Sequence, residues 1–138
     1  MTKLFLDTNV LLDLILKREP FAKWAWTIFK AMHDEKLELH TSSFAILTTY
    51  YISSKNGNET KARKSITYLL DNLSIKTSPT QILISSLDRN FNDYEDAVLH
   101  ECAFDHGQID FIITRDIKDF KKSLVEVMTP EEFCLTRM

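Results

Sequence analysis

The sequence predicts a three-layer α/β/α fold with a central, mainly parallel sheet of four to five strands. Short apolar runs alternate along the chain with longer segments whose apolar residues have helical spacing. No internal repeat or linker interrupts this alternation, and 138 residues is an ordinary length for one domain. Because this alternation is typical of a parallel sheet covered by helices on both faces, we expect a single domain over residues 1–138.

The first half of the chain contains two predicted strands. Lys3 to Leu6 is an apolar run that ends abruptly at Asp7, as a buried strand does, and residues 37–41 alternate like a half-buried strand. Pro20 suits the first position of a helix, and Ser42 or Ser43 can cap another. The predicted helices of this half lie at residues 10–17, 20–35, 44–54 and 59–72, with a loop at 55–58.

The second half continues the same alternation. Asp93 suits the cap of a helix that Gly107 closes, and Pro130 suits the start of a C-terminal helix. The predicted strands lie at residues 74–77, 110–114 and 125–127. The predicted helices lie at residues 79–89, 94–105 and 118–122 and from 130 onward.

Composition excludes several classes of protein. The formal net charge is −3, so nucleic-acid contact would have to use local basic patches. Only Gly57 and Gly107 are glycines, which excludes the glycine-rich phosphate loops of dinucleotide-binding proteins and P-loop NTPases. Two cysteines are too few for a disulfide framework and favour a reducing, cytoplasmic location. No window approaches the roughly 18 apolar residues of a membrane span, so we expect no membrane association.

Three carboxylates stand at the ends or starts of predicted elements that meet at one edge of the sheet. Asp7 follows the first strand, Asp116 lies two residues past the strand 110–114, and Asp96 stands in the first turn of the helix capped by Asp93. Ligands of open parallel sheets bind beyond the carboxyl ends of the strands. Without an obvious basic partner the three carboxylates would repel one another. A divalent cation relieves that repulsion, and oxygen ligands favour Mg²⁺ or Mn²⁺.

Each carboxylate also has a local explanation. Aspartate suits turns and the first turn of a helix, where it interacts favourably with the helix dipole. A phosphatase with a nucleophilic aspartate is another possibility, because Asp7 follows a first strand. That chemistry usually needs a second acid two residues later, where this chain has Asn9. We therefore favour the metal site.

Four segments in order resemble a PIN domain, most closely the compact bacterial PIN proteins related to VapC-type toxins. They are Asp7-Thr8-Asn9-Val10-Leu11-Leu12-Asp13, Asp93-Tyr94-Glu95-Asp96-Ala97, Ile113-Thr114-Arg115-Asp116-Ile117-Lys118-Asp119-Phe120 and Thr129-Pro130-Glu131-Glu132-Phe133. Each segment alone is weakly specific, but their order spans essentially the whole chain. The resemblance implies an endoribonuclease that uses Mg²⁺ or Mn²⁺ and is often held inactive by a cognate antitoxin.

The resemblance also implies roles for particular residues. It makes Asp7, Asp96 and Asp116 catalytic metal ligands, with Asp119 in support, and small polar residues line the same pocket at Thr8, Asn9 and Thr114. The family usually has a glutamate in the helix after the second strand, and here that position is Thr48. The alternative is therefore a PIN-fold module that binds RNA or protein and cleaves weakly or not at all.

Two further features bear on partners. Lys118 belongs to a basic group with Lys121 and Lys122 beside Asp116, which is either a solvated face or a contact for the RNA backbone. Trp24, Trp26 and Phe29 offer more aromatic surface than one helix face buries easily. They belong either to the core or to an interface with an antitoxin or a second copy of the chain. The histidines and cysteines have no zinc-site spacing.

Overall fold

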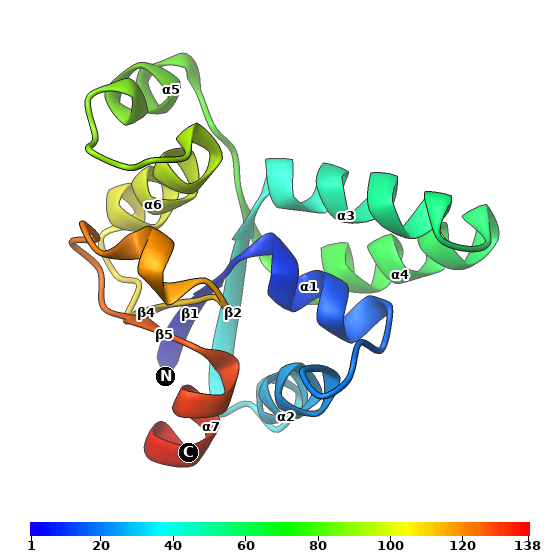
Figure 1. Ribbon diagram of the computed structural model, residues 1–138. Coiled ribbons are helices and arrows are strands. Elements are labelled where there is room, and N and C mark those ends of the chain that lie inside the picture. The colour runs from blue at the N-terminus through cyan, green and yellow to red at the C-terminus, as the bar shows by residue number, and fades with distance from the viewer.

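The computed structural model of residues 1–138 contains a five-stranded sheet in the order β3-β2-β1-β4-β5, with every neighbouring pair parallel (Figure 1). The strands are β1 (Thr2–Leu6), β2 (Leu37–Ser42), β3 (Ser74–Lys76), β4 (Phe111–Ile113) and β5 (Val127–Met128). The chain starts in the centre, builds one side of the sheet, and then crosses to β4 on the other side of β1. The junction of β1 and β4 is therefore the point where the strand order reverses, which is where ligands bind in sheets of this kind.

Seven α-helices and one short 3-10 helix connect the strands. They are α1 (Thr8–Ile15), α2 (Ala22–His33), α3 (Ser43–Lys55), α4 (Glu59–Asn72), α5 (Thr80–Leu87), α6 (Tyr94–His106), η1 (Ile117–Phe120) and α7 (Pro130–Arg137). None of the helices combines the length and the apolar character needed to cross a membrane.

Several helices begin or end where local sequence signals place them. The side chain of Ser42 accepts a hydrogen bond from the backbone N–H of Ala45 and caps α3. Asp93 caps α6, and Gly107 ends it in a left-handed conformation with φ of 80°. Thr129 and Glu132 form a capping box at the start of α7. The caps Ser42 and Asp93, the end at Gly107 and the start of α7 at Pro130 agree with the prediction, because these signals act within a few residues.

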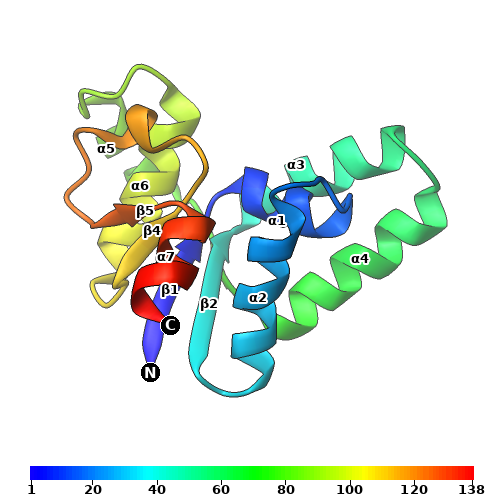
Figure 2. The same cartoon turned by 60° about the horizontal axis from the view of Figure 1, so that its bottom comes forward.

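The sheet separates two apolar layers, which confirms the predicted α/β/α architecture. Leu4 and Leu6 pack on one face with apolar residues of α1, α2, α3, α4 and α7. Phe5 points to the other face and packs with residues of α5, α6 and η1. This alternation follows from the period of two in a strand. Figures 1 and 2 show α5 and α6 on one side of the sheet and the α3–α4 pair extending away on the other.

Most element boundaries differ from the prediction by one or two residues, and two of these differences have a visible cause. Helix α2 begins at Ala22 rather than Pro20, because the N–H groups of Phe21 and Ala22 both bond to the carbonyl of Arg18 in a turn that precedes the helix. Strand β5 lies at residues 127–128 rather than 125–127. Its register is set by β4, because the N–H of Thr114 donates to the carbonyl of Met128.

Candidate functional site

A cavity of about 330 Å³ lies at the carboxyl ends of β1 and β4. Its walls come from the start of α1, from α3, from the start of α6 and from the segment after β4. The acidic residues that line it are Asp7, Glu95, Asp96 and Asp116, and the basic residues are Arg18 and Arg115. We call this space the acidic cavity.

Pairing between β1 and β4 fixes Asp7 in the wall of the acidic cavity. The backbone N–H of Asp7 donates to the carbonyl of Ile113 at 2.9 Å, which continues the ladder one residue beyond β1. Its Oδ1 accepts the N–H of Thr8 at 2.7 Å, so Asp7 caps α1. Its Oδ2 accepts the hydroxyl of Thr114 at 2.8 Å. With only 9% of its surface exposed, Asp7 is held firmly by its neighbours.

Asn9 links the two carboxylates that follow β1 and β4. Its Nδ2 lies 3.3 Å from Oδ2 of Asp7 and 3.2 Å from Oδ2 of Asp116. Its Oδ1 accepts the backbone N–H of Arg115 at 3.3 Å. Because one nitrogen contacts both carboxylate oxygens, these oxygens are no farther apart than the two contact distances together. The amide therefore keeps Asp7 and Asp116 close without adding charge.

The protonation behaviour of the carboxylates reflects their crowding. The pKa of Asp96 is raised from 3.8 to about 7, first by burial and then by the negative charges of Asp7, Asp93, Asp119 and Asp116. Burial also raises the pKa of Asp7, although the hydrogen bonds from Thr114 and Thr8 oppose this shift. Burial is the largest cause of both pKa shifts, and the negative charges of neighbouring carboxylates add to it.

The donor atoms of the acidic cavity fit a hard divalent cation. They are carboxylate oxygens, which Mg²⁺ and Mn²⁺ prefer, and a cation would relieve the repulsion that raises the pKa of Asp96. As the side chains stand, no group of three or more acidic, histidine or cysteine residues is arranged closely enough to hold an ion. Mg²⁺ typically keeps several waters and uses only one or two carboxylates of the protein. Asp7 and Asp116, which Asn9 links, supply that number of carboxylates.

The expectation that the carboxylates have no basic neighbour is wrong. Arg18 and Arg115 both line the acidic cavity, but each directs its guanidinium toward Asp13. Asp13 is 1% exposed and accepts from Nε and Nη2 of Arg115 at 2.7 and 3.1 Å, while Nε of Arg18 lies 3.1 Å away. Asp13 stands between Leu12 and Leu14 in an apolar helix, which was the sequence signal for a buried, paired charge.

The other predicted site residues occupy different places. Thr8 lines the acidic cavity beside Asp7. Thr114 is fully buried, and its hydroxyl reaches Asp7 rather than the open space. Lys118 and Asp119 lie on η1, outside the wall, although the charge of Asp119 contributes to the raised pKa of Asp96.

Thr48 and Glu95 also belong to the wall of the acidic cavity. Thr48, which the resemblance places where the family usually has a glutamate, lines the acidic cavity from α3. Glu95 also lines it, and its negative charge raises the pKa of Asp7. Glu95 was not among the site residues predicted from the sequence. Its position beside Asp96 in the first turn of α6 is the signal that indicates it.

Comparison with known proteins agrees with this architecture. The chain is 30% identical over 136 residues to Ribonuclease VapC1 of Aquifex aeolicus (strain VF5), covering 96% of this chain and 93% of that protein. Similar solved structures include VapBC2 from Rickettsia felis bound to a DNA fragment from its promoter, with a TM-score of 0.71 and 15% identity over 93% of this chain and 98% of that chain. A toxin–antitoxin complex from Klebsiella pneumoniae has a TM-score of 0.68 and 23% identity over 91% and 96% of the respective chains.

These two structural likenesses show a shared fold. The family itself is shown by sequence, because the family model described as PIN domain matches residues 3–118. That range contains the sheet from β1 to β4 and every acidic residue of the cavity. The chain therefore belongs to the PIN domain family.

Proposed function

We propose that this chain is an endoribonuclease that depends on Mg²⁺ or Mn²⁺ and acts as the toxin of a toxin–antitoxin pair. The observation that carries the proposal is the placement of Asp7, Asp96 and Asp116 around one cavity at the junction of β1 and β4. The raised pKa values of Asp7 and Asp96 support a site that needs a cation. The similarity to Ribonuclease VapC1 of Aquifex aeolicus supports RNA as the substrate.

In the proposed reaction Asp7, Asp96 and Asp116 hold the ion, and Asp119 supports them from η1. A divalent ion supplies polarisation of the scissile phosphate and a water molecule of lowered pKa. Thr114 and Asn9 keep Asp7 in position by donating hydrogen bonds to its Oδ2. Because these donors stabilise the ionised carboxylate, they favour the form that binds a cation.

RNA approaches the acidic cavity across a surface with local positive charge. Lys118, Lys121 and Lys122 are exposed on or beside η1, within a few residues of Asp116. Lysines of this kind attract phosphates without reading the base sequence. We assign Lys118 to contact with the RNA backbone and Thr8 to contact with the strand inside the acidic cavity.

A protein partner is part of the proposal. The similar structures include VapBC complexes from Rickettsia felis and Salmonella typhimurium and a toxin–antitoxin complex from Klebsiella pneumoniae. Their folds match more than nine-tenths of this chain. We infer that an antitoxin binds this chain as well and holds it inactive.

A second candidate function rests on Thr48. This residue lines the acidic cavity where the family usually supplies a glutamate, so the chain has one carboxylate fewer at that point. The second candidate is a PIN-fold module that binds RNA without cleaving it efficiently. The two functions differ in whether metal-dependent products form.

The test incubates the purified chain with structured and single-stranded RNA in the presence of Mg²⁺, Mn²⁺ or EDTA. We expect cleavage with either metal, none with EDTA, and none by Asp7→Asn. Asp34→Asn is the matched control, because Asp34 is exposed and pairs only with Lys30 on the surface. RNA binding without metal-dependent products would reject the ribonuclease and favour the binding module.

A further inference from the structure

A second cavity of about 220 Å³ adjoins the acidic cavity. Arg115 and Asp116 line both cavities, so the two share a wall. The other side chains used below are Phe21 and Trp24 at the start of α2 and Thr129 and Glu131 at the start of α7. We call this space the Phe21 pocket. Of the residues that line it, only Asp116 takes part in the proposed cleavage chemistry.

The Phe21 pocket has flat surfaces against which a planar ligand can stack. The guanidinium carbon of Arg115 lies 4.0 Å from the centroid of the Phe21 ring. Asp13 fixes the guanidinium at this position through two hydrogen bonds. Trp24 adds a second aromatic ring to the wall. Unstacked RNA bases are recognised by stacking on aromatic rings and on arginine guanidinium planes.

Two side chains of the same pocket, Arg115 and Glu131, have hydrogen-bonding atoms without a partner in the protein. Arg115 uses Nε and Nη2 for Asp13, so its Nη1 donors make no hydrogen bond within the protein. The carboxylate of Glu131 also makes none, because the capping box of α7 uses Glu132 instead. The pocket therefore presents a strong donor and a strong acceptor beside its stacking surface.

We propose that the Phe21 pocket binds an unstacked guanine base of the RNA strand whose phosphate lies in the acidic cavity, an inference that rests on the proposed ribonuclease function. Guanine offers the acceptors O6 and N7 to Arg115, which is the commonest specific pairing of arginine with a base. Its N1–H and amino group are two adjacent donors for the carboxylate of Glu131.

The other three bases match this pair of groups less well. Adenine has no carbonyl oxygen for the guanidinium, and uracil has no amino group for the carboxylate. Cytosine has an amino group and a carbonyl, but it lacks N7 and the second ring. A good bidentate contact discriminates between bases by roughly tenfold or more. The Phe21 pocket thus selects the base next to the cleaved phosphate.

Binding is measured with the full chain carrying Asp96→Asn, so that cleavage does not interfere. The probes are four fluorescein-labelled hexaribonucleotides of uridine with guanosine, adenosine, cytidine or uridine at one central position, followed by fluorescence anisotropy. We expect the guanosine probe to bind roughly tenfold more tightly than the other three. Adding Trp26→Phe leaves Trp24 as the only tryptophan, and the guanosine probe should then quench its emission.

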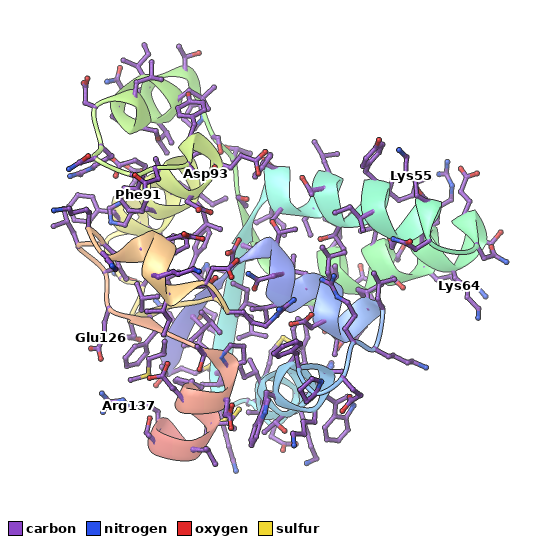
Figure 3. The ribbon with its side chains drawn as sticks, in the orientation of Figure 1. Lys55, Lys64, Phe91, Asp93, Glu126 and Arg137 are labelled. Carbon is purple, nitrogen blue, oxygen red and sulfur yellow. The ribbon has the colours of Figure 1, made fainter.

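Two substitutions separate hydrogen bonding from stacking. Glu131→Gln should abolish the preference for guanosine, whereas Glu126→Gln should leave it intact. Glu126 is a matched control because it is an exposed carboxylate that pairs with Arg137 and does not line the Phe21 pocket. Figure 3 labels both side chains of this pair. Phe21→Leu keeps the apolar volume but removes the ring, so it should weaken binding of all four probes.

The outcomes distinguish this inference from the proposed function. Equal affinity for the four probes, or equal effects of Glu131→Gln and Glu126→Gln, would overturn the guanine pocket. If the wild-type chain cleaves RNA with Mn²⁺ but the Asp96→Asn variants show neither guanosine preference nor Trp24 quenching, the pocket is wrong and the ribonuclease stands. If guanosine binding is selective but no RNA is cleaved, the pocket stands and the ribonuclease falls.

Discussion

The side-chain nitrogen of Asn9 lies 3.2 Å from Oδ2 of Asp116, a residue 107 positions later in the chain. Asn9 stands in the first turn of α1, directly after β1, and Asp116 follows β4. The contact exists because β1 and β4 are neighbours in the sheet. The same nitrogen contacts Asp7, so a neutral amide organises two carboxylates that would otherwise repel each other.

Removal of this link should weaken metal binding. We expect Asn9→Ala to reduce Mn²⁺ affinity about tenfold or more, because groups that orient metal ligands contribute roughly 10- to 100-fold to affinity. The measurement is the rise in Tm of the chain across a Mn²⁺ titration, since a ligand that binds only the folded state stabilises it. Asn56→Ala is the control, because the Asn56 amide bonds only to a backbone carbonyl within α3. Identical titrations for both variants would show that Asn9 does not organise the metal ligands.

The raised pKa of Asp96 makes the stability of the metal-free protein depend on pH. Its folded-state pKa is about 7 against an ordinary value of 3.8, so the folded protein holds a proton that the unfolded chain releases between these values. The contribution of Asp96 to stability is therefore fully present below about pH 4 and is lost as the pH rises through 7.

Asp96→Asn should remove this dependence. At pH 8 in EDTA, we expect the variant to be more stable than wild type by about 1–2 kcal/mol, after allowance for solvent screening of a half-buried group. The difference should shrink toward zero at pH 4. Urea unfolding at pH 8, 6 and 4 measures it, with Asp71→Asn on the exposed side of α4 as control. A difference that does not vary with pH would contradict the assigned pKa.

Thr48→Glu tests whether the acidic cavity accepts a further ligand. We expect a larger Mn²⁺-induced rise in Tm than in wild type, starting from a lower Tm without metal. The added carboxylate strengthens attraction for a hard cation but repels Asp7, Asp96 and Asp116 when no cation is bound. Leu47→Glu is the control, because it adds the same charge to α3 at a position that is 71% exposed. Equal shifts for the two variants would show that position 48 does not reach the ion.

Asp13→Asn should destabilise the fold far more than a surface substitution of the same kind. Asp13 is almost fully buried between Arg115 and Arg18, so its loss leaves two cations without their partner. Because both arginines are partly exposed, we expect a loss of about 2 kcal/mol rather than the ~3–5 kcal/mol of a fully buried pair. Urea unfolding compares it with Asp34→Asn, whose exposed pair with Lys30 contributes no more than about 0.5 kcal/mol. Similar losses in the two variants would argue against a structural role for Asp13.

The sequence alone predicted the layers of the fold and located the element boundaries to within two residues. Apolar runs such as Lys3 to Leu6 and the caps Ser42 and Asp93 act over a few residues, so their patterns are readable without a structure. The predicted start of α2 and the predicted position of β5 were each wrong by up to two residues. The first depends on a turn around Arg18, and the second depends on pairing with β4.

For the candidate site too, some features could be predicted from the sequence and others could not. From the sequence, Asp7, Asp96 and Asp116 are predicted to reach one edge of a parallel sheet, because each stands at the end or start of a recognisable element. Its motifs also carried the resemblance to the PIN domain family, to which the chain belongs.

The hydrogen bonds and ion pairs between the residues of this edge depend on the tertiary structure. The strand order brings β4 beside β1, which lets Asn9 reach Asp116 and lets Arg115 pair with Asp13 about a hundred residues away. The Phe21 pocket likewise needs walls from the starts of α2 and α7. Hydrophobic periodicity and capping are short-range and therefore written locally in the sequence, whereas these hydrogen bonds and cavity walls exist only after distant segments have packed together.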